Sequence, residues 1–225
     1  MKKKAELILA LDVKTIAKAK DFVDKLYPKI KIFKVGLELF TGCGPDIIDF
    51  LNKKGAEVFL DLKFYDIPNT VASAVRQAVR LRIKMLTLHI LGGEEMLKAA
   101  IKAADEEAAV LKIKRPLLIG VTVLTSQKVS PDEILKLAKI GIDYGLDGVV
   151  CSAQEVALLK REIKNDFFAV TPGIRQANAQ IQDQKRVATA KSAATDGSNF
   201  LVVGRSILES NDPIKTTNEL LGEIS

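Results

Sequence analysis

Acidic and basic side chains stand in or directly after three short apolar runs in the first part of the chain. Asp12 follows the first run, and Lys34 lies within the second. Asp61 and Lys63 lie two residues apart in the third run, so both point to one face of a strand, and Asp66 follows shortly after. Such residues could bind a polar substrate and transfer a proton. They could equally form a structural ion-pair network, which perturbs pKa values without any catalysis.

A second group of residues has the chemistry of an anion-binding site. Pro172 and Arg175 follow one apolar run near the end of the chain, and Gly204 and Arg205 follow the next. A glycine lets an anion approach backbone N–H groups, and a guanidinium offers a planar fork to phosphate oxygens. These positions therefore predict a phosphate pocket.

The segment between Gly173 and Gln184 reads IRQANAQIQD and is polar, with almost no residues suited to a core. It is either a solvated loop or a lid that closes on a ligand. From a closed lid, Gln184 could reach a bound phosphate.

Alternating strand-like and helix-like segments must position both groups. The runs that we expect to be strands lie at 6–12, 30–37, 57–63, 85–91, 116–124, 147–152, 167–172 and 200–205. Helical patterns lie near 15–27, 44–54, 69–82, 94–109, 131–141, 153–161, 183–194 and 212–222. Eight such pairs predict an α/β fold, a single (β/α)8 TIM barrel forming one domain over 1–225, whose ligand site lies at the carboxyl ends of the strands. A doubly wound open sheet remains the structural alternative.

The composition is that of a globular protein. Of 225 residues, 48% are hydrophobic and 28% are charged, which argues against disorder. The net charge is +6, but the lysines are scattered among acids, so we expect no nucleic-acid partner. No apolar run approaches the ~20 residues of a membrane-spanning helix, so we expect no membrane partner. The start, MKKKAELILALDV, resembles a signal peptide but reaches Asp12 without a cleavage site, and we interpret it as the first strand.

The chain has two cysteines and one histidine. Cys43 and Cys151 fit no metal spacing and no disulfide framework, so we expect packed, unreactive thiols and a cytoplasmic location. A single histidine cannot build a His-rich metal site, and we expect no metal. His89 lies among apolar neighbours, and we expect a structural histidine with its hydrogen bonds satisfied.

Two motifs connect these residues to a known family. The segment DLKFYDIPNT at 61–70 resembles the signature of the orotidine 5′-phosphate decarboxylases, and TPGIR followed nine residues later by Gln184 is a second match. The resemblance extends from LALDV near the start to VVGRSI near the end. It implies cofactor-independent decarboxylation of orotidine 5′-phosphate to UMP and CO2, the last step of UMP synthesis.

The resemblance also implies roles for the charged residues. Asp12 and Lys34 would bind the ribose hydroxyls. Lys34, Asp61 and Lys63, together with Asp66, would form the catalytic array, in which Lys63 protonates C6 of the pyrimidine. Removal of CO2 leaves a carbanion in the ring plane, and a protonated lysine supplies both a cation beside it and a proton.

The remaining substrate contacts are implied in the same way. Thr125 would contact the pyrimidine edge. Asp66, Ile67 and Thr70 would come from the neighbouring subunit of a homodimer and complete its site. The binding residues at the ends of the seventh and eighth strands are Pro172, Arg175, Gln184, Gly204 and Arg205, and all of these except Pro172 would hold the phosphate.

Two other functions compete with this interpretation. Magnesium-dependent sugar-phosphate decarboxylases or aldolases of the same superfamily share the Asp-x-Lys-x-x-Asp pattern, but they hold the metal with an acid near the end of the second strand. Lys34 occupies that position here and would repel the metal. A non-catalytic nucleotide- or RNA-binding barrel would explain the net charge, but it leaves Asp61 and Asp66 unexplained, because acids repel a polyanion.

Overall fold

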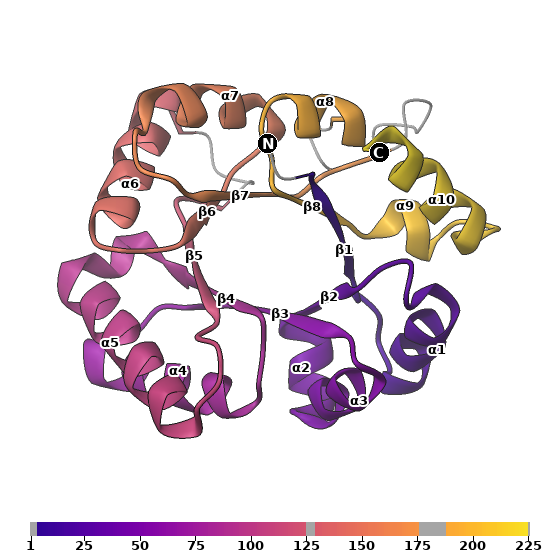
Figure 1. Cartoon of the computed structure of the whole chain (residues 1–225), viewed down its shortest axis with the longest axis horizontal. Helices are drawn as coiled ribbons and strands as arrows, with labels where there is room; N and C mark the ends of the chain where they lie inside the picture. Colours follow the sequence, from indigo (N-terminus) through magenta and orange to yellow (C-terminus); the bar gives the residue numbers. More distant parts are fainter. Residues whose placement is uncertain (1–3, 125–128, 176–187, 225) are drawn as a thin grey trace.

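The computed structural model describes residues 4–124, 129–175 and 188–224, and its centre is a closed barrel of eight parallel strands (Figure 1). The strands are β1 (Glu6–Ala10), β2 (Ile32–Gly36), β3 (Glu57–Phe64), β4 (Met85–His89), β5 (Leu117–Val121), β6 (Gly148–Val150), β7 (Phe168–Thr171) and β8 (Phe200–Val203). They follow one another around the barrel in chain order, and β8 pairs with β1 with Leu7 opposite Leu201. The predicted barrel is therefore confirmed, and the open sheet is wrong.

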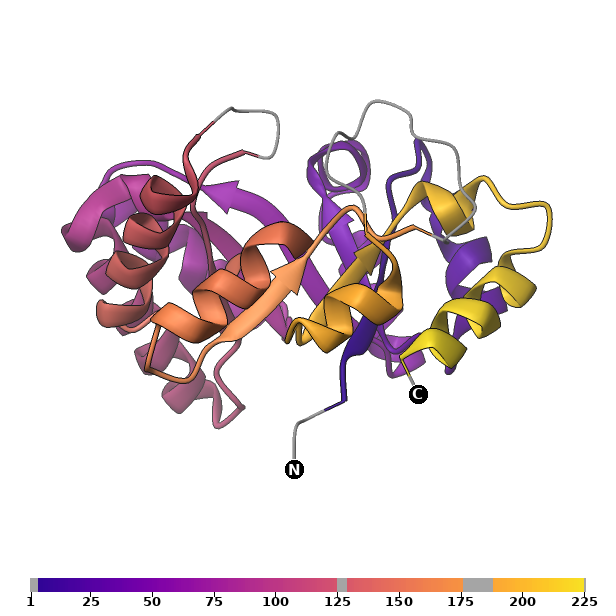
Figure 2. The ribbon, with the colours of Figure 1, turned by 90° about the horizontal axis from the view of Figure 1, so that it is seen from above.

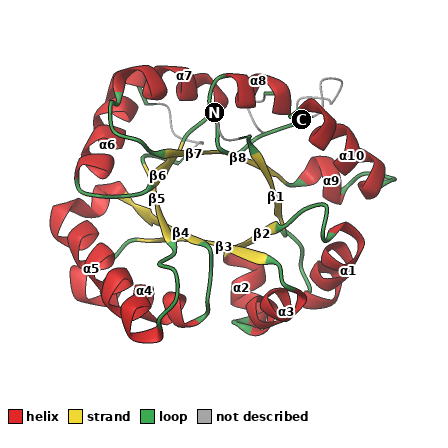
Figure 3. Ribbon diagram, in the orientation of Figure 1, coloured by secondary structure: helices red, strands yellow, loops and turns green. Residues whose placement is uncertain are grey.

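Helices form a ring outside the strands (Figure 3). They are α1 (Ile16–Leu26), α2 (Leu37–Cys43), α3 (Asp46–Lys54), α4 (Pro68–Arg80), α5 (Gly93–Leu111), α6 (Pro131–Asp143), α7 (Ala153–Glu162), α8 (Ala190–Thr195), α9 (Arg205–Leu208) and α10 (Pro213–Glu223). None within the described ranges is both long and apolar enough to cross a membrane. Because all strands run in one direction, their carboxyl ends meet at one rim (Figure 2).

Side-chain alternation separates two hydrophobic clusters. One fills the space between the strands and the helices. The other fills the inside of the barrel and consists of Ile8, Ala10, Ile32, Phe59, Met85, Ile119, Val170, Phe200 and Val202. Two residues beyond the inward-facing Ala10, Ile32 and Phe59 come Asp12, Lys34 and Asp61. Since strand side chains alternate with period two, the same faces that make an apolar floor place charges at the rim.

Several sequence-based boundaries are wrong. Helix α2 was not expected, because Gly42 and Gly44 weaken its helical pattern, and α9 is too short to show a period. The strand expected over 85–91 ends at His89, and a 3-10 turn follows. The helix expected from 183 begins only at Ala190, where the Thr189 side chain accepts a hydrogen bond from the Ser192 backbone; residues 183–187 lie outside the described part.

Candidate active site

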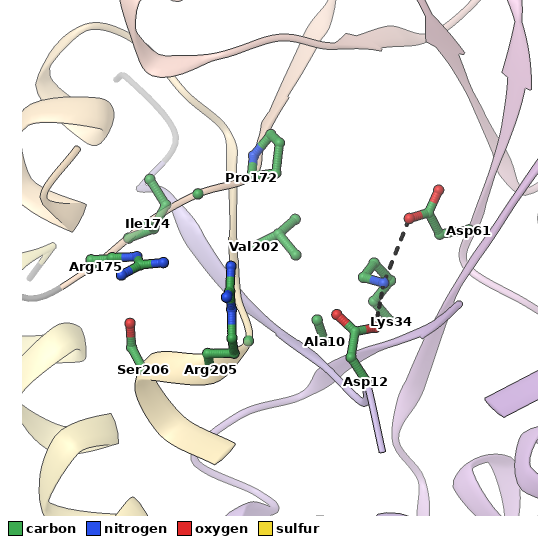
Figure 4. Close-up of a pocket in the computed structure, with 12 residues that line it drawn as sticks. Ala10, Asp12, Lys34, Asp61, Pro172, Ile174, Arg175, Val202, Arg205 and Ser206 are labelled. Atoms are coloured by element: carbon green, nitrogen blue, oxygen red, sulfur yellow. Dashed lines mark hydrogen bonds and ion pairs between the residues drawn. The ribbon is translucent and has the colours of Figure 1, made fainter. Parts of the chain in front are cut away.

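Four of the expected charged residues meet at the rim in a continuous chain of ion pairs. Lys34 Nζ donates to Asp12 Oδ1 at 2.9 Å and lies 3.6 Å from Asp61 Oδ2 (Figure 4). Lys63 Nζ donates to Asp61 Oδ1 at 2.8 Å. The order Asp12, Lys34, Asp61, Lys63 therefore alternates in charge across three neighbouring strands.

Asp61 is the buried centre of this array. Its side chain is 14% exposed, against 55% for Asp12 at the outer end. Burial raises the pKa of Asp61, but the ammonium groups of Lys34 and Lys63 outweigh it, helped by hydrogen bonds from Lys63 and Thr87. The net pKa is lowered, so the carboxylate stays ionised and holds both lysines against it.

A bulge near the end of β3 aims Lys63. The register between β3 and β4 shifts between Leu60 and Phe64, and Lys63 has a φ of 52°, in the left-handed region that long side chains rarely adopt. Its backbone N–H donates to Thr87 Oγ1 at 2.9 Å, which holds this conformation. The prediction that Asp61 and Lys63 lie close together is confirmed. Strand alternation alone does not produce this contact, because a bulge also contributes to it.

Thr87 is a site residue that the sequence analysis missed. It is fully buried, and its hydroxyl accepts from the Lys63 backbone while donating to Asp61 Oδ1 at 2.9 Å. The available signal was its position two residues after the inward-facing Met85. Threonine is common in strands, however, so the residue type alone does not indicate a role in the site.

His89 corrects another expectation. It ends β4, and its ring packs against Tyr65 with centroids 5.4 Å apart. Its Nδ1 is buried and has no hydrogen-bond partner among the described residues, so the expected fully satisfied histidine is wrong for this atom. Burial lowers the pKa of His89, the charge of Lys63 lowers it further, and Asp61 opposes the shift. The imidazole is therefore held neutral beside the charged array.

The array opens onto a polar cavity of about 220 Å³. Asp12, Lys34 and Asp61 line one side, and Figure 4 shows Arg175 and Arg205 gathered on the other side. Pro172, Gly173, Gly204 and Ser206 contribute to the same cavity. A Cβ added to Gly204 would make only ordinary contacts, 3.6 Å from Ala10 Cβ and 3.7 Å from Asp12 Oδ2, and would lie at the cavity wall. The space therefore does not require a glycine at this position.

An apolar hollow of about 270 Å³ adjoins this cavity and shares Lys34, Asp61, Pro172 and Val202 with it. Lys63 opens into this second hollow. Its other walls are Phe59, Val121, Val123, Leu124, Val150 and Val170. The combined site therefore has a polar part with two arginines and an apolar part into which Lys63 opens.

Other expected residues lie elsewhere. Asp66, Ile67 and Thr70 are exposed and line neither hollow, and the Asp66 carboxylate accepts a hydrogen bond from the Ile67 backbone at 2.6 Å. Asp66 thus does not join the array of its own chain. Thr125 and Gln184 lie outside the described residues. In the parts of the chain that are described, no three His, Cys, Asp or Glu side chains are arranged to hold a metal ion.

Comparisons with known proteins agree with this geometry. Residues 5–220 match the family model described as "Orotidine 5'-phosphate decarboxylase / HUMPS family". The chain is 44% identical over 231 residues to the orotidine 5′-phosphate decarboxylase of Syntrophotalea carbinolica, covering 98% of this chain and 95% of the relative. It is 46% identical over 230 residues to that of Hydrogenovibrio crunogenus, covering 97% and 95%. The crystal structure of orotidine 5′-phosphate decarboxylase from Lactobacillus acidophilus superposes with a TM-score of 0.86 at 35% identity, covering 98% of this chain and 99% of that one.

Proposed function

The chain belongs to the orotidine 5′-phosphate decarboxylase / HUMPS family, and we propose that it converts orotidine 5′-phosphate to UMP and CO2. Near-complete coverage at more than 40% identity by relatives with this activity supports the reaction. The observation that carries the proposal is the position of Lys63. Its ammonium is paired with a buried carboxylate and faces an apolar hollow next to a cavity with two arginines.

The chemical problem is a carbanion that the substrate ring cannot delocalise. Most decarboxylases solve it with an electron sink such as pyridoxal or thiamine cofactors. We propose that fixed charge does so here, without a cofactor. One ammonium at ~4 Å and an effective dielectric of ~20 contributes ~4 kcal/mol. Enzymes commonly supply ~8–23 kcal/mol, so other interactions must add to it.

In the proposed step, the bond between C6 and the carboxylate carbon breaks and its electron pair remains on C6. Lys63 Nζ donates a proton to C6, which gives UMP and leaves a neutral amine that solvent reprotonates. Asp61 keeps Lys63 charged and oriented, as their 2.8 Å contact supports. We also propose that Asp61 presses against the substrate carboxylate and destabilises the bound ground state.

Binding of the distant phosphate would supply much of the remaining stabilisation. Arg175 and Arg205 face the polar cavity and suit the phosphate, and Gly204 lines the same cavity. We assign Gln184 to the same group and Thr125 to the pyrimidine edge. Asp12 and Lys34 would bind the ribose hydroxyls between the two ends, as their place between the arginines and Lys63 supports.

The test is a spectrophotometric assay with orotidine 5′-phosphate, with and without a chelator. We expect decarboxylation that the chelator leaves unchanged. Loss of activity with the chelator would favour the magnesium-dependent sugar-phosphate branch, which Lys34 argues against because it places a cation where that branch holds its metal. Binding of UMP without any turnover would favour a non-catalytic nucleotide-binding barrel.

We further propose that the chain acts as a homodimer in the cytoplasm. Asp66, Ile67 and Thr70 would complete the site of the neighbouring copy. Ile67 is 66% exposed and Tyr65 is 62% exposed, so both chain neighbours of Asp66 present large apolar side chains to solvent. The two free cysteines are compatible with a reducing compartment.

A further inference from the structure

Gly36 ends β2 two residues beyond Lys34 and is the N-cap of α2. Its φ of −96° and ψ of −176° are extended, a conformation that any residue adopts. The backbone therefore does not require glycine. The N-cap position accepts glycine about as well as threonine, so it permits the residue without requiring it.

The space around Gly36 gives a different reason for the glycine. A Cβ built on this residue would lie 3.0 Å from Lys34 Nζ and 3.4 Å from Asp12 Oδ1. The ammonium is the end of a long side chain, but it is not free to move away. It is held at 2.9 Å by Asp12 and at 3.6 Å by Asp61, and the side chain is only 12% exposed.

We infer that Gly36 is a positioning residue for Lys34. Its missing side chain leaves the space in which the ammonium meets both carboxylates, and this placement sets where ribose hydroxyls can bind. The inference deepens the proposed function and rests on it. A methyl group at position 36 would displace the ammonium by a few tenths of an ångström and put an apolar surface against it.

The chain offers a matched control on the neighbouring helix. Gly42 lies within α2, and a Cβ there would meet nothing within 4 Å. Gly36→Ala and Gly42→Ala are therefore the same chemical change six residues apart, one against the charged array and one in open space. Gly42→Ala should leave activity unchanged and keep or raise the melting temperature.

For Gly36→Ala we expect kcat/KM for orotidine 5′-phosphate to fall at least ~10-fold, which corresponds to ~1.4 kcal/mol. Affinity for UMP should fall more than affinity for 2′,3′-dideoxy-UMP, because the defect lies at the hydroxyl contacts. A purely structural role would weaken both ligands alike. Wild-type kcat/KM in Gly36→Ala, or equal loss for the two ligands, would overturn the inference.

A double-mutant cycle tests whether the effect passes through Lys34. In a Lys34→Ala background, Gly36→Ala should weaken UMP binding no more than about twofold, because the crowded atom has been removed. Additive losses would contradict the inference. If Gly36→Ala fails to fold, the double variant should fold again, and failure of both would assign the glycine to the fold instead. An inactive wild-type protein would instead refute the proposed function.

Discussion

Asp61 stands between two lysines, and the proposed chemistry depends on which of them faces the substrate base. Lys63 opens into the apolar hollow, whereas Lys34 also lines the polar cavity with Asp12. Lys63→Ala should therefore lower kcat by ~10²–10⁴-fold or more, the usual contribution of a positioned proton donor. Affinity for UMP should change only a few-fold. Lys53→Ala, at an exposed position on α3, is the control. Turnover of the Lys63 variant within a few-fold of wild type would show that Lys63 is not the proton donor.

Thr87 makes two hydrogen bonds at the centre of the site, one with the Lys63 backbone N–H and one with the Asp61 carboxylate. Thr87→Val keeps the shape but leaves the Lys63 N–H and Asp61 without their shared partner. We expect a loss of ~1–3 kcal/mol in the free energy of unfolding and a lower kcat. Thr87→Ser retains the hydroxyl and should recover most of both losses. Chemical denaturation and initial rates measure the two effects, and a Val variant as stable and active as wild type would show that the hydroxyl is dispensable.

The lowered pKa of Asp61 fixes the direction of a pH effect. A carboxyl group with a lower pKa in the folded state stabilises the fold above its unfolded pKa of ~3.9. That contribution disappears as the pH falls through the folded value. The difference in unfolding free energy between wild type and Asp61→Asn should therefore shrink below about pH 4. Urea denaturation from pH 7 to pH 3 tests this. A difference in unfolding free energy that grows as the pH falls would show that the pKa of Asp61 is not lowered in the folded state.

Arg115 and Asp147 illustrate how elements are joined at the base of the barrel, away from the rim. The Asp147 carboxylate accepts two hydrogen bonds from Arg115, at 2.8 and 2.9 Å, and one from the Leu118 backbone at 2.8 Å. Arg115 also pairs with Asp105 of α5. Asp147→Ala should lower the free energy of unfolding by ~1–3 kcal/mol, since a part-buried N–H loses its acceptor. Activity at 25 °C should stay within about twofold of wild type. A large loss of kcat with intact stability would contradict a purely structural role of Asp147.

At the scale of elements, the count of eight strand–helix pairs predicted the barrel but left an open doubly wound sheet as the alternative, which the pairing of β8 with β1 rules out. Strand alternation explains why Lys34 and Asp61 lie at the rim, two residues beyond Ile32 and Phe59. It could not reveal the left-handed backbone of Lys63, which a contact with another strand stabilises. Nor could alternation predict the surroundings of His89, because its ring contacts Tyr65 across the paired strands β3 and β4.

At the scale of the whole molecule, the proposed dimer makes a prediction about mixtures of inactive variants. Lys63→Ala and Asp66→Ala homodimers should each have little activity. If Asp66 serves the neighbouring copy, a heterodimer of the two variants contains one site with both native residues, so mixing under exchange conditions should restore activity. No recovery, with heterodimers verified by mass, would mean that Asp66 acts within its own chain or not at all.

The apolar floor below the charged rim has a consequence for the order of events. Among the described residues, Ile8, Ile32 and Phe59 close the barrel under Asp61, and the Lys63 side chain, which is 31% exposed, opens into the apolar hollow above them. A product bound in this hollow would lie between Lys63 and solvent. We therefore expect the amine of Lys63 to regain its proton after UMP has left the site.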